Sequence, residues 1–367
     1  MGNDRLIYIR TDGNAKIASG HLVRCFSIAL ACQSIGMEVR FLVSDRESLH
    51  LLKEISGTCE FPILQLKTAS FDHFDRELPE VISLLAKEEN TRVIYFVDSY
   101  YVTEKYLSTL KPLVKTVYLD DLQSFDYPVD LLINYDVISS ADMPSYKDFY
   151  QSAGQLLLGS FYTPLRGQFQ NRLTHTRKKV SDVLVTTGGS DPCHFCLDLI
   201  HYIDDYSASP TAKDLLYVKF HIVIGQLNTD KEELYRLANI FPFLELHENV
   251  SDMASLMASC DLAISAAGTT LYELCALGIP TISFAMADNQ LCTAKAFDQV
   301  QAIPWAGDIR TSLSEALTKI LQFIAENINP LSNSYDKRKA AHNAMRNLVD
   351  GNGSLRIAYA LRELYLK

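Results

Sequence analysis

A histidine stands at the start of a predicted helix, directly after a run of small residues. The stretch "IASGHLVRC" (17–25) follows a predicted strand and brings His21 into the first turn of that helix. The positive end of the helix dipole disfavours a second positive charge there, so a neutral imidazole is expected. A neutral imidazole is the form that takes a proton from water. His21 is therefore the candidate general base, and a purely structural histidine is the alternative.

Three carboxylates follow predicted strands in the same half of the chain. Asp12 stands in "YIRTDG" together with Arg10, Asp98 in "FVDSYY" and Asp121 in "YLDD". Because the carboxyl ends of parallel strands meet at one edge of a sheet, these groups are expected close to His21. Capping of the next helix is the simpler reading of each one. As a group, they are predicted to bind sugar hydroxyls or amides.

The second half carries a turn suited to an anion. The stretch "ISAAGTTLYELCALGIP" runs from a buried strand through Gly268 into a helix. Gly268 permits close approach of the backbone, and Thr269 and Thr270 add hydroxyls beside the free N–H groups of the first turn. Glu273 is either a capping-box carboxylate or an acceptor for two ribose hydroxyls. A phosphate-bearing ligand is predicted here.

A second glycine turn, "TTGGSDP", also follows a strand and precedes a helix. Its Gly188, Gly189 and Ser190 are predicted to offer N–H groups to a diphosphate. Neither turn matches G-x-G-x-x-G or the P-loop, which disfavours a dehydrogenase or a Walker ATPase. In "ADNQ", after another strand, the amides of Asn289 and Gln290 suit phosphate or sugar, although an ordinary turn explains them too.

Short apolar runs that alternate with amphipathic helices position these residues. Such runs predict an α/β fold with parallel sheets covered on both faces. In the first half they are "LIYIR", "VRFLV", "VIYFVD" and "TVYLDD"; after "RKK" come "VSDVLV", "LLYVKFHIVIG", "FLELHENV", "LAISAAG" and "TISFAM". The predicted organisation is a first domain at 1–160, a linker at 161–177, a second domain at 178–345 and a C-terminal helix at 346–367.

Composition narrows the class of protein. The chain has 367 residues and a net charge of −10, which is too long for one core and too acidic for a nucleic-acid surface. Without a signal peptide or an apolar run of membrane-spanning length, a cytoplasmic protein is expected. Eight scattered cysteines, of which only Cys193 and Cys196 have C-x-x-C spacing, predict reduced thiols. The sequence has no H-E-x-x-H motif or similar set of metal ligands, so no metal or other cofactor is expected.

Six of the other eight histidines were considered and receive no role at this point. They fall in stretches that look like loops or exposed surface, or flank the first helix of the second domain: His50, His73, His175, His247, His194 and His201.

The motifs together resemble a known family in nearly the whole chain. "RTDGNAKIASGHLVRC", "VDSYY", "YLDD", "LLLGSFYTPLR", "VTTGGSDP", "VSDMASLMASCDLAISAAGTTLYELCALGIPTISF" and "ADNQ" are similar to the UDP-sugar hydrolases of pseudaminic acid biosynthesis. Members release UDP from UDP-2,4-diacetamido-2,4,6-trideoxy-β-L-altropyranose. They have a GT-B fold, two Rossmann-like domains facing across a cleft, related to the glycosyltransferase that makes lipid II. Relatives in spore-coat and other surface polysaccharide clusters share the motifs.

The resemblance implies a role for each matching residue. His21 would activate a water that attacks the anomeric carbon with inversion, without a metal. UDP would lie mainly in the second domain. The resemblance implies that Gly268, Thr269 and Thr270 meet the diphosphate, that Glu273 meets the ribose, and that Tyr162, Arg166, Asn289 and Gln290 lie near the substrate. With the residues singled out above, the full predicted set of nucleotide contacts is Gly188, Gly189, Ser190, Val250, Gly268, Thr269, Thr270 and Glu273. The predicted substrate contacts are Arg10, Asp12, Gly20, Asp98, Asp121, Tyr162, Arg166, Asn289 and Gln290.

One departure stands in the loop before His21, where Ala18 occupies a glycine position of the family. An alanine costs little there if its φ is negative, so a slightly different loop is expected. Two other functions stay open: a GT-B glycosyltransferase, in which the same histidine deprotonates a sugar hydroxyl, and a binder of nucleotide sugars without turnover. A lipid-linked acceptor would call for a basic-flanked amphipathic patch, and the sequence offers none.

Overall fold

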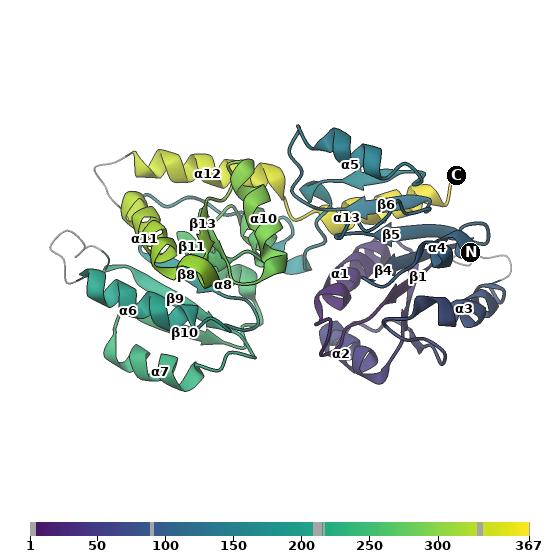
Figure 1. Cartoon of the computed structure of the whole chain (residues 1–367), viewed down its shortest axis with the longest axis horizontal. Coiled ribbons are helices and arrows are strands. Elements are labelled where there is room, and N and C mark those ends of the chain that lie inside the picture. The colour runs from purple at the N-terminus through teal and green to yellow at the C-terminus, as the bar shows by residue number, and fades with distance from the viewer. Residues whose placement is uncertain (1–4, 89–91, 208–214, 216, 329–332, 367) are drawn as a thin grey trace. The chain divides into compact units, whose positions relative to one another are not determined.

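The computed structural model describes residues 5–88, 92–207, 215, 217–328 and 333–366. The chain divides into two compact units, Met1–Gly167 together with Gly351–Lys367, and Gln168–Asp350 (Figure 1). Each unit contains one sheet whose strand pairs are all parallel. The predicted α/β class and the two Rossmann-like sheets are thereby confirmed. The domain boundaries drawn from the sequence stay a proposal, and the two units differ from them in assigning residues 351–367 to the first unit.

The first unit has the strand order β3-β2-β1-β4-β5-β6-β7. Its strands are β1 Arg5–Thr11, β2 Glu38–Val43, β3 Ile63–Gln65, β4 Arg92–Asp98, β5 Lys115–Leu119, β6 Leu131–Asn134 and β7 Leu156–Leu158. Its α-helices are α1 Gly20–Ser34, α2 Arg46–Ser56, α3 Leu78–Leu85, α4 Glu104–Leu110, α5 Met143–Phe149 and α13 Gly353–Leu364. Short 3₁₀ turns are η1 Phe74–Glu77, η2 Ser160–Tyr162 and η3 Gly167–Phe169. The chain reverses its direction of strand addition between β1 and β4, which is where ligands bind in such sheets.

The predicted helix after β1 is α1, and it ends as its sequence indicated. Gly36 stands two residues past the last helical residue with a φ of +80°. Glycine adopts this left-handed conformation without the clash that a Cβ brings, so it stops the helix and turns the chain into β2. The buried face of α1 includes Leu22, Cys25, Ile28 and Cys32, whose spacing of three and four residues follows the helical repeat.

The last helix of the chain, α13, returns to the first unit and packs against α1. A Cβ built at Gly353 would lie 2.1 Å from the carbonyl oxygen of Thr163, so glycine is required for this close approach. Tyr365 donates a hydrogen bond of 2.7 Å to the carbonyl oxygen of Leu6 in β1. Residues 351–367 therefore help to form the first unit instead of extending the second.

The second unit has the strand order β10-β9-β8-β11-β12-β13. Its strands are β8 Asp182–Thr186, β9 Lys219–Ile224, β10 Leu244–Glu248, β11 Leu262–Ala266, β12 Thr281–Ala285 and β13 Trp305–Asp308. Its helices are α6 Phe195–Ser207, α7 Lys231–Ile240, α8 Met253–Ser259, α9 Thr270–Leu277, α10 Asp288–Gln299, α11 Ile309–Ile328 and α12 Ser334–Leu348. The order reverses between β8 and β11, and the two predicted glycine turns follow these two strands.

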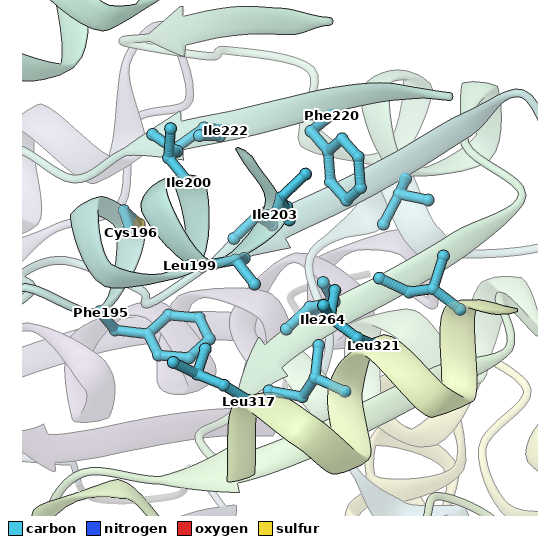
Figure 2. Packing of buried hydrophobic residues seen from close by; sticks show 14 of the residues in the cluster. Phe195, Cys196, Leu199, Ile200, Ile203, Phe220, Ile222, Ile264, Leu317 and Leu321 are labelled. Carbon is cyan, nitrogen blue, oxygen red and sulfur yellow. The ribbon is translucent and has the colours of Figure 1, made fainter. Parts of the chain in front are cut away.

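One face of the second sheet packs on α6 and α11 (Figure 2). On α6, Phe195, Leu199 and Ile203 lie four residues apart and so form one apolar stripe. The Phe195 ring stacks on Phe284 of β12 at 3.9 Å between centroids. Cys196 is fully buried in this core, where burial raises the pKa of its thiol. All eight cysteines carry free thiols.

Among the described residues, no helix has both the length and the apolar character needed to cross a bilayer.

Candidate active site

His21 and Asp98 meet at the reversal point of the first sheet. Asp98 is the last residue of β4 and pairs in register with Thr11 at the end of β1. His21 is the second residue of α1, which begins after the loop that follows β1. Its Nδ1 lies 2.6 Å from Oδ1 of Asp98, and both side chains are buried. The predicted proximity of the histidine to a strand-end carboxylate is realised.

Arg24 joins this pair to a second carboxylate. It follows His21 by three residues, so the two side chains share one face of α1. Its Nε and Nη2 donate to the two oxygens of Asp98 at 2.6 and 2.5 Å. Its Nη1 donates to Asp121 at 2.7 Å and to the Tyr135 hydroxyl at 2.6 Å. The guanidinium therefore holds both predicted carboxylates beside the histidine.

The charges around Asp98 keep it ionised. Burial alone raises the pKa of this carboxyl, but Arg24 and His21 outweigh it and bring the pKa below its usual value. An ionised carboxylate only accepts hydrogen bonds, so Nδ1 of His21 must carry the proton that it donates. Nη2 of Arg24, 2.9 Å from the same Nδ1, then makes its hydrogen bond to Asp98 instead. In the neutral ring this tautomer leaves the lone pair on Nε2.

Tyr100 covers the imidazole. Its ring meets that of His21 edge-on at 4.4 Å between centroids, and only 3% of the His21 side chain is exposed. Tyr100 is itself 43% exposed, and burial raises the pKa of its phenol to about 12. The phenol is therefore neutral at pH 7, and access to the histidine depends on its position.

Arg10 and Asp12 belong to a separate, buried ion-pair group. Arg10 is fully buried and donates to Asp12 at 2.5 Å and twice to Glu77, each at 2.9 Å. The other oxygen of Asp12 accepts the backbone N–H of Ser44 at 2.7 Å. Glu77 also accepts from the hydroxyl of Tyr106 at 2.7 Å. These contacts occupy the polar atoms that sequence analysis assigned to the sugar, so that assignment is not supported by the geometry.

The loop before His21 differs from expectation at Ala18. Its φ is +57°, in the left-handed region, so the condition of a negative φ, under which an alanine costs little, is not met. The loop closes on itself through a bridge between Asn14 and Ala18, and the side-chain oxygen of Asn14 accepts from the N–H groups of Lys16 and Ile17. The glycine that the related family has at this position is the residue that such a conformation favours.

Ala18→Gly should therefore stabilise the protein slightly. Relief of the left-handed strain is worth about 1–2 kcal/mol, and the greater freedom of glycine in the unfolded chain removes about 0.4–1 kcal/mol of that gain. We expect the free energy of unfolding to rise by up to about 1 kcal/mol in urea titrations. Ala15→Gly is the matched control, because Ala15 is exposed in the same loop and has no positive φ; a loss in both variants would contradict this account of Ala18.

In the turn after β11, the N–H of Gly268 donates to the carbonyl oxygen of Ala266 at 2.9 Å, and those of Leu271 and Tyr272 donate to the carbonyl oxygens of Gly268 and Thr269 at 3.1 Å. The N–H groups of Thr269 and Thr270 remain the candidates for a ligand. α9 begins at Thr270, and Thr269 at the N-cap makes no side-chain capping hydrogen bond. The open space at the Cβ position of Gly268 fits a ligand near the backbone. Glu273 is half-buried at the fourth helical position, one beyond that of a capping-box carboxylate. Thr269 therefore does not cap α9 through its hydroxyl, and Glu273 does not stand at the capping-box position.

The turn after β8 packs closely against Gly225, a glycine that sequence analysis did not single out. Gly188 has a φ of +85°, and a Cβ at Gly225 would lie 2.4 Å from backbone atoms of Gly188 and Gly189. Asn228 follows closely, is 6% exposed, and its Nδ2 has no hydrogen-bond partner among the described residues. A buried amide donor beside the turn adds to the polar groups that a ligand can use.

The other predicted site residues are placed as follows. Gln290 lies in the first turn of α10, where its Oε1 accepts the N–H of Met286 at 2.9 Å. Asn289 beside it is exposed, as is Gly20 at the start of α1. The remaining three are half-buried: Tyr162 in η2, Arg166 and Val250.

Arg24, Tyr100, Gly225 and Asn228 are the residues here that sequence analysis missed. The spacing of Arg24 three residues after His21 was a usable signal, because positions i and i+3 of a helix face the same way. Tyr100 followed Asp98 by two residues in a stretch already under consideration. Asn228 gave no signal, since its importance depends on how β9 pairs with β8.

The two parallel sheets belong to a known class of fold, and comparisons with solved structures agree with this class. The chain has the GT-B fold of glycosyltransferases. It matches Acinetobacter baumannii MurG with a TM-score of 0.65 at 14% identity, covering 98% of this chain and 99% of that one. It matches Arabidopsis thaliana UGT89C1 complexed with UDP-L-rhamnose with a TM-score of 0.66 at 12% identity, over 98% and 99% of the two chains.

Sequence comparisons point to nucleotide-sugar proteins. Residues 183–348 match the glycosyltransferase family 28 C-terminal domain. The spore coat polysaccharide biosynthesis protein SpsG of Bacillus subtilis (strain 168) is 29% identical over 220 residues, 59% of this chain and 61% of that protein. The pseudaminic acid cytidylyltransferase and UDP-2,4-diacetamido-2,4,6-trideoxy-beta-L-altropyranose hydrolase of Helicobacter pylori (strain ATCC 700392 / 26695) is 23% identical over 282 residues, 77% of this chain. The match spans 44% of that relative's length, so this chain covers less than two thirds of either protein.

Proposed function

We propose that this protein hydrolyses a UDP-linked amino sugar of the UDP-2,4-diacetamido-2,4,6-trideoxy-hexose type and releases UDP. The observation that carries the proposal is the contact between Asp98 and Nδ1 of His21, which leaves Nε2 as a base. Similarity to a relative whose name includes such a hydrolase, and to the family 28 C-terminal domain, supports the substrate class. The product would serve nonulosonic acid or surface polysaccharide synthesis.

In the proposed reaction, Nε2 of His21 removes a proton from a water molecule as its oxygen attacks the anomeric carbon. The bond between that carbon and the β-phosphate oxygen breaks, and UDP leaves with the bonding electron pair. A single displacement of this kind inverts the anomeric configuration. Asp98 holds the ring in its tautomer and stabilises the imidazolium that forms, as a carboxylate does in hydrolytic triads. Arg24 is a positioning residue, because it acts on the histidine through Asp98.

The second unit supplies the nucleotide contacts in this proposal. The turn at Gly268 and the N–H groups of Thr269 and Thr270 would meet the diphosphate, where the helix dipole stabilises the charge that develops on leaving UDP. Glu273 would accept two ribose hydroxyls. Gly188, Gly189 and Ser190, with the amide of Asn228, would provide further donors. Val250 would lie against the uracil ring of UDP.

For the sugar, we keep Asp121, Gly20, Tyr162, Arg166, Asn289 and Gln290 as proposed contacts. Arg10 and Asp12 receive a different role from the one their sequence context suggested. Because their charges are paired with each other and with Glu77 in the interior, we assign them to holding the end of β1 in place.

A glycosyltransferase is the second candidate, and the GT-B fold and the family 28 match favour it. The same base would then deprotonate an acceptor hydroxyl instead of water. The two functions differ in what they need: a hydrolase releases UDP in buffer alone, whereas a transferase depends on an acceptor sugar or lipid.

The test is a panel of UDP-sugars incubated with the protein, with free UDP measured and the first-formed anomer followed by NMR. We expect UDP release without an acceptor, fastest for a diacetamido-trideoxy-hexose, and a product of inverted configuration. Binding of every substrate without release would instead identify a nucleotide-sugar binder. Release that requires an added acceptor would identify the transferase.

Glu273→Ala is expected to weaken UDP binding through the ribose. Loss of hydrogen bonds to a charged group costs about 1.5–3 kcal/mol, which corresponds to a Kd raised by about 10–150-fold. Calorimetry with UDP and 2′-deoxy-UDP separates this role from a general effect. The wild type should prefer UDP, and the variant should bind both ligands equally. A preference for UDP that survives in the variant would reject the ribose role.

Chelation should leave the reaction unchanged, because the proposed chemistry assigns no step to a metal ion. We expect the rate of UDP release after dialysis against EDTA to equal the rate before it. The control is readdition of Mg²⁺ or Zn²⁺ to the dialysed protein. A rate that falls on chelation and returns with a metal would move the activation of water from His21 to a metal-bound oxygen.

A further inference from the structure

Two histidines and a glutamate gather on one face of the second sheet, near its edge. Among the described residues they are His221 on β9, and Glu245 and His247 on β10, and their candidate ligand atoms all lie within 4.8 Å of one another. β10 is the edge strand of this sheet, and His221 pairs in register with Glu245 (Figure 1 shows both strands). Residues 245 and 247 are two apart, so they point to the same side. The apolar core lies on the other side, where Phe220, Leu244 and Leu246 point.

The three side chains converge on one point. Nδ1 of His221 lies 3.0 Å from Nε2 of His247, and Oε1 of Glu245 lies 3.9 and 3.6 Å from these two nitrogens. Ligands at about 2.0–2.1 Å from a tetrahedral Zn²⁺ are separated by about 3.3 Å. The observed separations bracket this value. Sequence analysis gave His247 no role, because the register that brings β10 beside His221 of β9 is not visible in the sequence.

A carboxylate behind the cluster orients one imidazole. Asp182 on β8 lies 2.9 Å from Nε2 of His221, and Ser181 donates to its other oxygen at 2.6 Å. His221 therefore donates from Nε2 and presents the lone pair of Nδ1 to His247. A carboxylate behind a ligating histidine is the usual arrangement around zinc, where it sets the tautomer and raises ligand basicity. Burial fits this role: His221 is 7% exposed, while the side chain of Glu245, 44% exposed, leaves a side open to water.

We propose that His221, His247 and Glu245 bind a divalent ion of the Zn²⁺ class, with a water as fourth ligand. Without the ion, a proton on Nε2 of His247 joins the two rings as an N–H···N hydrogen bond. On binding, the ring of His247 changes tautomer, so that its proton moves by way of water from Nε2 to Nδ1. Both rings turn slightly about their soft terminal torsions, and both lone pairs then meet the metal. Lys219 binds the second oxygen of Glu245 at 3.2 Å and leaves Oε1 for the ion.

The ion would fasten the edge strand to the sheet and take no part in the chemistry proposed above. His221 lies four residues before Gly225, at which β9 meets the glycine turn after β8. At about 3.3 Å per residue, the two positions are about 13 Å apart along the strand. The site therefore acts on stability, whereas the nucleotide contacts lie beyond the carboxyl ends of the strands.

The test uses the full chain, without an affinity tag, dialysed against EDTA and then titrated with Zn²⁺ or Co²⁺. We expect one ion per chain, an intense visible spectrum of tetrahedral Co²⁺, and a Tm raised by about 5–10 °C at a Zn²⁺ concentration of about 100 Kd. His247→Ala should weaken Zn²⁺ binding more than about 100-fold, and Asp182→Asn about 10–100-fold. His50→Ala, which removes an exposed histidine, is the matched control and should bind as the wild type does.

Two outcomes would overturn the proposal. Zn²⁺ bound equally well by the wild type and by a folded His247→Ala variant would assign the ion to other groups, such as the cysteines. The absence of a tetrahedral Co²⁺ spectrum and of any Tm shift would leave the two rings joined by a hydrogen bond alone. Glu245→Gln provides a second variant at an exposed position, where folding is not at risk, and it should also weaken binding.

Discussion

His21→Asn is expected to lower kcat for UDP release by about 10²–10⁴-fold, the usual contribution of a general base. Asparagine retains a polar side chain of similar reach but cannot take a proton from water. The nucleotide contacts proposed here come from the second unit, so the Kd for UDP should stay within about twofold of the wild-type value. Initial rates of UDP release and calorimetric titration with UDP measure the two quantities separately.

The matched control is His50→Asn, because His50 is exposed on α2 and contacts Glu54, also exposed on the same helix, at 3.3 Å. That variant should retain the wild-type rate. Full activity in His21→Asn would remove the histidine from the chemistry. Loss of activity together with loss of UDP binding would show that the substitution disturbs more than the base.

Asp98→Asn is expected to affect both catalysis and folding. The buried carboxylate accepts from His21 and twice from Arg24. An amide there leaves the guanidinium, 11% exposed, without its main partner, and breaking a buried ion pair in this way costs about 3–5 kcal/mol of stability. An asparagine can either accept from Nδ1–H or donate to an unprotonated Nδ1, so it no longer fixes the active tautomer, and kcat should fall by about 10²–10⁴-fold.

A readout beyond activity distinguishes these two effects. The ¹⁵N chemical shifts of His21 should report Nδ1–H in the wild type and a changed tautomer in Asp98→Asn, at a temperature where urea titration shows the variant folded. Unchanged shifts together with an unchanged kcat in the folded variant would contradict the role given to Asp98. Unchanged shifts with a reduced kcat would restrict that role to stabilising the imidazolium.

The pairing of His21 with Asp98 could be predicted because it follows from the order of elements. In a parallel sheet the strand ends share one edge, so a histidine after β1 and an aspartate at the end of β4 meet wherever these strands are neighbours. The same rule brought the turns at Gly188 and Gly268 to the ends of β8 and β11, which are also adjacent.

The partners of Arg10 and Asp12 could not be predicted in this way. Glu77 is 67 residues from Arg10 and stands in a 3₁₀ turn without a sequence signature. In the sequence, Arg10 close to Asp12 resembles a ligand-binding pair. Only the position of Glu77 in the structure shows that the arginine belongs to an internal ion-pair group. The positive φ of Ala18 could not be predicted either, because alanine disfavours that conformation. A glycine at this position would have indicated it.

The most direct test of the proposed function is hydrolysis of the preferred UDP-sugar in H₂¹⁸O without an acceptor, with mass spectrometry of the products. Attack of water on the anomeric carbon puts ¹⁸O into the free sugar and leaves UDP unlabelled. Free sugar incubated in the same water without the protein corrects for exchange of its anomeric oxygen. We predict ¹⁸O in the free sugar and unlabelled UDP with the wild type, and a rate of release lower by about 10²–10⁴-fold with His21→Asn. Label in the terminal phosphate of UDP would mean attack at phosphorus and would contradict the account.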